Sequence, residues 1–464
     1  MRIVTSRAAL AALITLALAA PATAQFPSTP PAIGKPKPFT LPARRTITLA
    51  NGMKVSMVPF GATPKVAVRL ALRTGSIDET ADQIALAALM GDLWNEGTAT
   101  KDAKTIAQVM SGMGGQLGIG AGSDLTSIGA DVLSSHAAEM VTLVGEVARQ
   151  PRFPESELAR LKANRLRNLA IARTQPSTQA GVKFGAMMFG DHPYGRGLPT
   201  DDQIKGYTID QVKAFYAANM GAARAHLYVV GRFDAAEVEK AARAAFTDWA
   251  AGPAPSVKPV NMPKERQVAV IDRPAAVQST VYVGLPVAEQ AHPDYIKLVV
   301  TDAILGGSFG SRITSNIREN KGYTYSPFST IATRRGGAFW AEIADVTTNV
   351  TGASLTEIFK EVEKLRNEAP PAEELARIQR NMAGTFVLQN GSRAGIAGQF
   401  ANVDAYNLGE DYLSTWTSRV LAVTPQDVQK TMQQYLTPEK MSVVVVGDRK
   451  VIDEQLKQVL GAVP

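Results

Sequence analysis

The segment Glu157–Asn164, ELARLKAN, recurs later in the chain as Glu374–Asn381, ELARIQRN. A second pair of segments recurs at nearly the same separation. In Thr208–Gly231 a capped helix leads into the strand-like run AHLYVVG, and in Thr424–Gly447 a capped helix leads into MSVVVVG. Two independent matches with almost the same offset are poorly explained by chance. They indicate that the chain arose by an internal duplication.

The duplication predicts two homologous domains, residues 45–249 and 267–464, joined by a proline-rich linker over 250–266. In the first half, the hydrophobic patterns predict a hairpin over 46–58, strands over 66–72 and 116–132, and helices over 83–94, 156–171 and 210–218. In the second half, they predict a strand over 279–285, helices over 293–305 and 311–319, and strands over 323–345. Hairpins grouped with long helices are typical of the α+β class, in which helices pack on a largely antiparallel sheet.

The N-terminus carries a targeting pattern. Two arginines precede the apolar run 8–20, and small residues lead up to Ala24. This pattern predicts a secretory signal peptide over 1–24, because the apolar run is shorter than the roughly 20 residues that a membrane-spanning anchor needs. The proline-rich stretch 25–44 is expected to form an extended leader. We therefore expect a periplasmic or secreted protein without a membrane span.

Composition argues against several classes of protein. The chain has no cysteine, so disulfides and thiolates contribute nothing to its fold or chemistry. Its formal charge of +7 is small for 464 residues, only 6% of the residues are aromatic, and no long run of lysine and arginine is present. These features argue against nucleic-acid binding. The length favours two or more domains.

The segment Leu305–Ser326, LGGSFGSRITSNIRENKGYTYS, combines a Gly-Gly turn, a short helix and a strand. Arg318 lies near the end of the helix, and Tyr325 is expected in the strand. The segment closely resembles a hallmark of the pitrilysin/insulysin family of zinc peptidases, which includes mitochondrial processing peptidase. In that family, the matching arginine and tyrosine contact the substrate backbone across a clamshell, opposite the zinc. Both side chains can donate a hydrogen bond to a carbonyl oxygen that becomes an oxyanion.

Other stretches extend the resemblance over nearly the whole mature chain. They flank the first helix, form an edge strand and make a later turn: Gly75, Ser76 and Glu79; Glu96–Thr98; Gly114–Leu117 with Asp124 and Thr126; and His192–Gly195. The resemblance implies two homologous α+β domains arranged as one half of a clamshell. In the family, a peptide substrate binds along the edge strand. The matching positions here are the glycine-rich run Gly118, Ile119, Gly120 and Ala121.

The chain departs from the family at the metal site. Family enzymes carry a His-x-x-Glu-His motif on the first helix, in which two histidines bind zinc and the glutamate acts as a base. The matching positions are Ala88, Gly91 and Asp92, and the family's third ligand, a glutamate, corresponds to Asn168. One carboxylate cannot replace two imidazoles and a carboxylate. We therefore expect no metal in this chain.

One other segment contains part of a metal-ligand pattern. His136 and Glu139 have the His-x-x-Glu spacing, but Met140 stands where a second ligand would be needed. The segment also begins a different helix from the one that carries the family's motif. We therefore interpret His136 as a surface histidine. The remaining histidines are scattered along the sequence without ligand spacing.

The resemblance implies a peptidase subunit. The family includes pairs in which one chain carries the zinc motif and a paralogue carries the Arg/Tyr pair, and this chain has the second pattern. It is therefore expected to be inactive alone and to form a heterodimer with a zinc-bearing paralogue. Arg318 and Tyr325 would then act on an unfolded peptide, which would add as a strand to a sheet edge, most naturally the partner's. The glycine-rich edge of this chain either leaves room for a peptide or has degenerated.

Two alternatives stay open. A non-catalytic scaffold or peptide-binding protein of the same fold also fits the loss of the zinc ligands. In that case, Arg318 is an ordinary helix-end arginine and Tyr325 a half-buried strand residue. An autonomous hydrolase of another type would need a nucleophile with its base, and the sequence shows no such group. Retention of Arg318 and Tyr325 favours the peptidase subunit, since a scaffold has no evident need for them.

Overall fold

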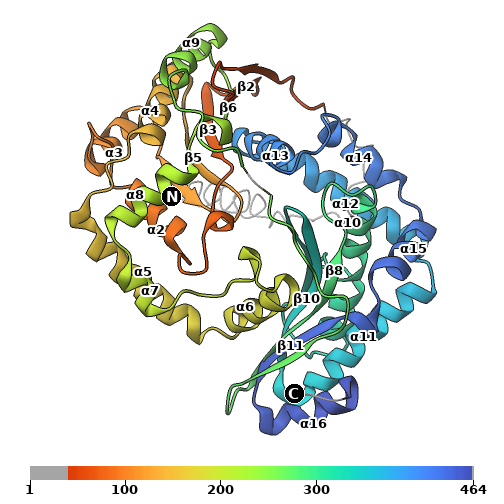
Figure 1. The fold of residues 1–464 in the computed structure, drawn as a ribbon. Coiled ribbons are helices and arrows are strands. Elements are labelled where there is room, and N and C mark those ends of the chain that lie inside the picture. Colours follow the sequence, from red (N-terminus) through yellow and green to blue (C-terminus); the bar gives the residue numbers. More distant parts are fainter. Residues whose placement is uncertain (1–39, 256, 462–464) are drawn as a thin grey trace, which may run out of the picture. The chain divides into compact units, whose positions relative to one another are not determined.

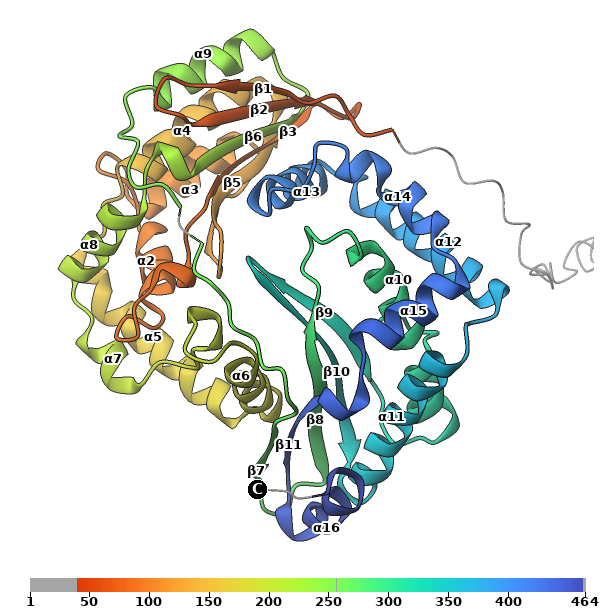
Figure 2. The same cartoon turned by 45° about the vertical axis from the view of Figure 1, so that its right-hand side comes forward.

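The computed structural model describes residues 40–255 and 257–461 (Figures 1 and 2). The predicted signal peptide, 1–24, and most of the leader, 25–44, lie outside the described residues. The first of two sheets has the strand order β1-β2-β6-β3-β5-β4. Its strands are β1 (Arg45–Thr48), β2 (Lys54–Pro59), β3 (Lys65–Leu72), β4 (Gly118–Ala121), β5 (Thr126–Leu133) and β6 (Ala225–Gly231).

The second sheet repeats this order. Its strands are β7 (Val268–Asp272), β8 (Gln278–Val287), β9 (Phe328–Arg334), β10 (Gly337–Thr347) and β11 (Ser442–Gly447). The order β7-β11-β8-β10-β9 corresponds to β2-β6-β3-β5-β4, and β1 is an addition in the first half. In both sheets the leading pair of this order is parallel, β2 with β6 and β7 with β11, and the other neighbours are antiparallel. The shared order confirms the internal duplication and the α+β class.

The predicted hairpin over 46–58 is present. Strands β1 and β2 pair with Thr46 opposite Ser56. The turn between them places Gly52 at a φ of 86°, a left-handed conformation that glycine adopts without strain. The strand predicted over 116–132 is a second hairpin, formed by β4 and β5, because the chain turns between Gly122 and Leu125.

The helix predicted over 83–94 begins later than expected, as α2 (Leu86–Trp94). Ala85 has a φ of 71°, so the backbone there is not α-helical. The buried carboxylate of Glu79 accepts hydrogen bonds from the backbone nitrogens of Ala85, at 3.1 Å, and Ala87, at 2.8 Å. These bonds satisfy N–H groups that a helix start leaves without partners. A glutamate from the preceding loop therefore sets the start of α2.

Helices cover one face of each sheet. On the first sheet α4 packs on β3 and β5, and on the second sheet α10 packs on β9 and α11 on β10. The helices of the first half are α3 (Ala103–Gly112), α4 (Ala137–Arg149), α5 (Glu155–Thr174), α6 (Pro176–Phe189), α7 (Asp201–Gly206), α8 (Ile209–Asn219) and α9 (Ala235–Phe246). Those of the second half are α10 (Tyr295–Leu305), α11 (Thr351–Asn367), α12 (Ala372–Gln389), α13 (Arg393–Ala405), α14 (Tyr412–Ala422), α15 (Pro425–Tyr435) and α16 (Arg449–Leu460).

Each half contributes one helix that packs on the sheet of the other half. Helix α6 follows α5 in the first half but packs on β8 and β11 of the second sheet, and α13 follows α12 in the second half but packs on β3 and β6 of the first. Both helices lie between the two sheets, where they cover the faces that the other helices leave open (Figure 2). The described residues accordingly belong to one compact unit that begins at Thr40.

The two exchanged helices are held by different sets of contacts. Phe184 and Phe189 of α6 pack on Phe339, with ring centroids 5.3 Å and 5.8 Å apart, in an apolar cluster that belongs to the second sheet's core. Helix α13 also buries an apolar face, and it adds polar contacts, among them an ion pair of 2.8 Å between Arg393 Nη2 and Asp131 Oδ2. Burial of apolar surface therefore contributes to both exchanges, and hydrogen bonds and charges add to the second.

The strands of the two sheets come from opposite sides of the predicted linker, 250–266. Helices α6 and α13 each pack on the sheet of the other half, so the packing does not separate the chain at the linker. The domain limits 45–249 and 267–464 therefore stay a prediction. Within the described ranges, no helix is both long and apolar enough to span a membrane.

Candidate functional site

The segment that carries Arg318 and Tyr325 begins at a tightly packed Gly-Gly turn. A Cβ atom at Gly306 would lie 2.4 Å from a carboxylate oxygen of Glu342, and one at Gly307 would lie 2.4 Å from a carboxylate oxygen of Asp302. Neither glycine can therefore be replaced without moving the turn. The Gly-Gly pair lets the backbone approach two buried acids directly below the segment.

The short helix Thr314–Asn320 follows this turn and is anchored from both neighbouring helices. Arg312 forms a two-pronged ion pair with Glu374 of α12, at 3.0 Å and 2.7 Å. The amide of Asn316 donates to Glu361 of α11 at 2.8 Å. Bidentate arginine pairs fix orientation as well as distance. The helix that presents Arg318 is therefore held in place at two points.

The structure brings Arg318 and Tyr325 together at the surface. The Cζ atom of Arg318 lies 5.0 Å from the ring centroid of Tyr325 and 4.5 Å from that of Phe309, so two aromatic rings contact one guanidinium. The side chain of Tyr325 is 79% exposed and that of Phe309 is 74% exposed. Tyr325 lies in the loop before β9 rather than in a strand, and it is not half-buried. The expectation that placed it in a strand is therefore wrong.

Phe309 was not identified from the sequence. The sequence offered one signal, an aromatic residue within a glycine-rich turn, where burial in a core is not expected. Its contact with Arg318 orders a long side chain that would otherwise sample many rotamers. We define Phe309, Arg318 and Tyr325 as the exposed cation–aromatic cluster.

Two buried carboxyl groups lie beneath this segment. Asp302 accepts hydrogen bonds from the indole nitrogen of Trp340, at 2.7 Å, and from the hydroxyl of Ser329. Burial raises the pKa of Asp302 to about 6, against the effect of these two donors. Neither carboxylate oxygen of Glu342 has a hydrogen-bond partner among the described residues, and its burial together with the neighbouring Asp302 raises its pKa well above the usual range. Glu342 is therefore expected to stay protonated at neutral pH.

The positions that match the family's zinc ligands lie on α2 and α5. Ala88 and Gly91 offer no donor atom, and Asn168 on α5 is exposed. Among the described residues, no group of three or more His, Cys, Asp and Glu side chains could hold a metal ion. The nearby Glu79 is occupied as the cap of α2, and burial raises its pKa to about 7. The side chains present do not form a zinc site.

Asp92, the one carboxylate at these positions, is already paired. Its Oδ2 lies 2.7 Å from Nε of Arg165, which projects from α5 one turn before Asn168. Burial raises the pKa of Asp92, and the charge of Arg165 acts in the opposite direction. The sequence reasoning missed Arg165. A cation of the protein itself therefore pairs with the one carboxylate at the family's ligand positions.

The former metal positions and the exposed cation–aromatic cluster lie far apart in this chain. Helix α2 packs on β4, α5 and α8 of the first half, whereas the short helix Thr314–Asn320 packs on α11 of the second. In both views α2 and α11 lie on opposite sides of the unit (Figures 1 and 2). Arg318 and Tyr325 therefore do not face the chain's own degenerate metal site.

The predicted substrate-binding edge is strand β4. It pairs with β5 on one side, and no other described strand pairs with its second side. Ile119 and Ala121 are partly buried, and a Cβ atom at Gly91 of α2 would lie 3.5 Å from that of Ala121. Gly118 and Gly120 line a cavity of about 470 Å³ between the first sheet and α13. The edge thus has a free row of backbone groups beside α2.

His136 and Glu139 are joined at the surface by a hydrogen bond of 2.8 Å between Nδ1 and Oε2. A 33% exposed histidine with one carboxylate partner, followed by the buried Met140, agrees with the interpretation of His136 as a surface residue. It supplies no metal-ligand set.

Three polar side chains in the structure contact one another in the order of a catalytic triad. Ser56 Oγ lies 2.8 Å from His226 Nε2, and His226 Nδ1 lies 3.4 Å from Asp404 Oδ2. Ser56 is fully buried, however, and burial lowers the pKa of His226 to about 4. Asp404 also accepts hydrogen bonds from Arg44, at 2.9 Å, and Tyr228, at 2.7 Å. A substrate cannot reach this serine. These polar contacts therefore hold α13 on the first sheet.

Two models of one peptidase family match consecutive parts of the chain. The model described as Insulinase (Peptidase family M16) matches residues 60–200, and the model described as Peptidase M16 inactive domain matches residues 206–382. The chain belongs to the M16 family of peptidases. The resemblance inferred from the sequence is thereby confirmed. The M16 model over 60–200 spans α2, β4 and α5, so this member lacks the zinc ligands within a region that the family model matches.

Relatives and solved structures agree with this assignment. An uncharacterized zinc protease of Streptomyces coelicolor is 23% identical over 90% of this chain and 92% of its own length. An uncharacterized zinc protease of Mycobacterium leprae is 27% identical over 61% of this chain, and the match spans 65% of that relative. A crystal structure described as a peptidase M16 inactive domain from Pseudomonas fluorescens is 26% identical, with a TM-score of 0.79 over 87% of this chain and 98% of that one. This chain is thus an M16 member with the family fold and without the zinc-ligand set.

Proposed function

We propose that this M16 chain is the non-zinc subunit of a heterodimeric peptidase and that it supplies Arg318 and Tyr325 to a partner's active site. One observation carries the proposal. The exposed cation–aromatic cluster is preorganised at the surface, on the opposite side of the unit from the chain's own former metal positions. A chain that used these residues on a peptide bond would therefore need a metal from another chain.

The chemistry of the two side chains suits this role. The guanidinium of Arg318 and the phenol hydroxyl of Tyr325 both donate hydrogen bonds, and a scissile carbonyl gains negative charge on its oxygen during attack by water. Donors that are already oriented stabilise this charge without reorganising at the moment of reaction. The two aromatic contacts of Arg318 and the anchored helix Thr314–Asn320 supply that orientation. Zinc is expected in the partner subunit and would supply the activated water.

The substrate is proposed to be an unfolded peptide that adds as a strand to a free sheet edge by main-chain hydrogen bonds. Strand β4 lies at the edge of the first sheet, beside a helix without zinc ligands, which supports this mode of binding. The partner is proposed to be a zinc-motif-bearing paralogue with the equivalent edge beside an intact metal site. Both chains are proposed to work in the periplasm or outside the cell, as the pattern over 1–24 indicates.

The experiment is to purify the mature chain alone, a co-exported zinc-motif paralogue alone, and the two together, and to assay cleavage of an unstructured peptide. The proposal expects a complex on size-exclusion chromatography and cleavage that the mixture performs much faster than either chain alone. A stable complex that cleaves no faster than the paralogue by itself would instead support a scaffold. Cleavage by the present chain alone would contradict the assignment of a non-catalytic subunit.

A further inference from the structure

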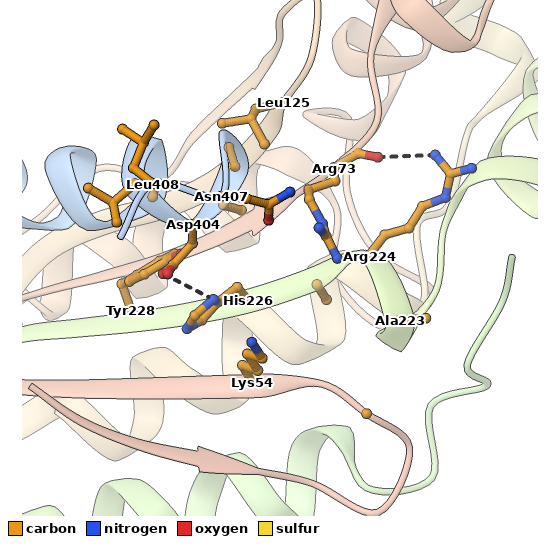
Figure 3. Close-up of a pocket in the computed structure, with 16 residues that line it drawn as sticks. Lys54, Arg73, Leu125, Ala223, Arg224, His226, Tyr228, Asp404, Asn407 and Leu408 are labelled. Carbon is orange, nitrogen blue, oxygen red and sulfur yellow. Dashed lines mark hydrogen bonds and ion pairs between the residues drawn. The ribbon is translucent and has the colours of Figure 1, made fainter. Parts of the chain in front are cut away.

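A second cavity, of about 310 Å³, lies between the first sheet and the end of α13 (Figure 3). Strands β2 and β6 contribute Lys54 and His226, and Arg73 follows β3 directly. Asp404, in the last turn of α13, and Asn407, just after it, face these residues from the second half of the chain. The cavity therefore has walls from both halves, and polar side chains converge on it.

Most of the charges in this cavity are already balanced. The guanidinium of Arg224 lies 3.1 Å from Asp78 and also donates to the backbone carbonyl of Arg73. The carboxylate of Asp404 accepts from Arg44 and Tyr228, as described above. His226 is neutral near pH 7, because burial lowers its pKa to about 4. Asp404 therefore has little capacity left to neutralise another cation.

Lys54 and Arg73 are the exceptions. Within the described ranges, neither side chain makes a hydrogen bond or an ion pair, although Arg73 is only partly exposed. Lys54 is exposed and keeps its hydration, whereas Arg73 is partly withdrawn from water without a protein partner, which is costly. Together the two unpaired cations leave the cavity with an excess of positive charge.

The surroundings of Arg73 strengthen this excess. Its pKa is lowered by burial and by the neighbouring guanidinium groups of Arg335 and Arg224, with Tyr228 and Asp404 acting in the opposite direction. Arg335 comes from the tip of the β9–β10 hairpin in the second half. Like charges from both halves therefore converge near one partly desolvated arginine, and an anion placed there would relieve the repulsion.

The remaining walls limit the kind of anion. Leu125 and Leu408 contribute apolar surface, and Asn407 offers a carboxamide from a strained left-handed backbone position, with a φ of 52°. Asp404 and the carbonyl end of α13 would repel a doubly charged group. A singly charged carboxylate with a small apolar body fits this combination better than phosphate does.

We propose that this cavity is a binding site for a carboxylate, with Lys54 and Arg73 holding the charged group and Asn407 adding a hydrogen bond. The carboxylate comes either from the C-terminus of a peptide or from a small free monocarboxylate. Because the walls come from both halves, the bound anion joins the first sheet to the end of α13. The site is separate from Arg318, Tyr325 and the positions on α2, so it does not depend on the proposed peptidase role.

The probes are the tripeptide Ala-Ala-Leu, the same tripeptide with a C-terminal amide, sodium propionate and inorganic phosphate. Each is titrated by calorimetry into the mature full-length chain at low ionic strength. The proposal expects the tripeptide acid to bind at least about 10-fold more tightly than its amide, since one hydrogen-bonded charge is lost. Binding of the acid together with propionate identifies a general carboxylate site. Binding of the acid without propionate identifies a site for peptide C-termini.

Two variants locate the binding. Lys54→Gln and Arg73→Gln should each weaken binding of the preferred probe by about 10-fold or more. Lys104→Gln and Arg152→Gln, at exposed positions outside the cavity, are the matched controls and should leave affinity unchanged. Lys54 is exposed, so the test remains decisive even where Arg73→Gln does not fold.

Four outcomes overturn the proposal. One is equal affinity for the tripeptide acid and its amide. Another is binding of phosphate in preference to both carboxylates. The third is a Lys54→Gln variant that binds as the unaltered protein does. The fourth is absence of binding by every probe at millimolar concentration.

Discussion

The Nε atom of Arg165 lies 2.7 Å from Oδ2 of Asp92, so a side chain of α5 pairs with the one carboxylate left at the zinc-ligand positions of α2. In an M16 enzyme this space between the two helices would hold a divalent cation. Here the protein supplies its own positive charge, which neutralises Asp92 and repels a metal. The loss of metal binding is therefore built into both helices and does not rest on missing histidines alone.

The first prediction concerns this metal site. The dialysed protein should hold far less than one zinc per chain, because Asp92 is the only carboxylate at the four positions and Arg165 pairs with it. Removing the cation by Arg165→Gln should still create no site, since Ala88 and Asn168 do not replace the other two ligands of the family. Elemental analysis of both proteins is the measurement. One tightly bound zinc per chain in either protein would show that the assignment of α2 is wrong.

The second prediction concerns the exchanged helices. If the chain is cut between residues 253 and 263, each half should keep part of its secondary structure but expose the sheet face that its neighbour's helix normally covers. The halves should therefore associate when mixed, through Phe184 on Phe339 and Arg393 on Asp131. Size-exclusion chromatography and circular dichroism of the separate and mixed halves measure this. Halves that stay monomeric and fully folded after mixing would contradict the exchange.

The third prediction concerns the hydrogen bond between Tyr228 and Asp404, which joins β6 to α13 at 2.7 Å. Tyr228→Phe removes only the hydroxyl and should lower the free energy of unfolding by about 1.5–3 kcal/mol, the usual range for a bond to a charged group. A double-mutant cycle with Asp404→Asn isolates the pair from the other partners of Asp404. Denaturant unfolding gives the four values. Strict additivity of the two changes would mean that the pair does not couple the halves.

The fourth prediction concerns pH. The folded-state pKa of Asp302 is raised to about 6, from an unfolded value of about 3.9. Between these two values the folded state holds more protons than the unfolded state, so the stability contributed by this group is full below about pH 4 and falls as the pH rises through 6. Because the pKa of Glu342 is also raised, the folded state continues to lose stability at higher pH. The loss from Asp302 alone is on the order of 3 kcal/mol.

Glu342→Gln is the test of this pH dependence. The variant keeps the shape of the side chain and removes its proton equilibrium, so it should stabilise the protein relative to the unaltered chain at pH 8 and do so less at pH 4. Thermal unfolding at both values, with Glu410→Gln at an exposed position as control, measures the difference. A Glu342→Gln effect that is the same at pH 4 and pH 8 would show that the buried carboxyl does not titrate.

The duplication and the topology shared by the two halves were accessible from the sequence because repeated segments keep the same local patterns. The crossing of α6 and α13 was not, because a helix pattern tells which face is apolar but not which sheet that face will meet. The sequence predicts that Phe184 is buried, but it does not tell which half's core Phe184 joins. Only the packing shows that it belongs with Phe339.

The candidate site was predictable to a similar extent. Arg318 and Tyr325 could be identified through a resemblance, and the loss of both histidines and the glutamate at Ala88, Asp92 and Gly91 could be seen directly in the sequence. Phe309 and Arg165 were missed, because a stacked ring and a compensating ion pair depend on side-chain positions that spacing does not encode. Tyr325 was placed in a strand because the residues after Gly322 have strand-like composition, but β9 begins only at Phe328.

The most direct test of the proposed function is the rate of peptide cleavage by the reconstituted heterodimer with Tyr325→Phe. Tyr325 is 79% exposed, so the change should leave the fold and the complex intact, which size-exclusion chromatography verifies. Tyr323→Phe in the same loop is the matched control. We predict that Tyr325→Phe lowers turnover by about 10²-fold to 10³-fold, the usual effect of losing one oxyanion donor. A Tyr325→Phe heterodimer that assembles and cleaves at the unaltered rate would contradict it.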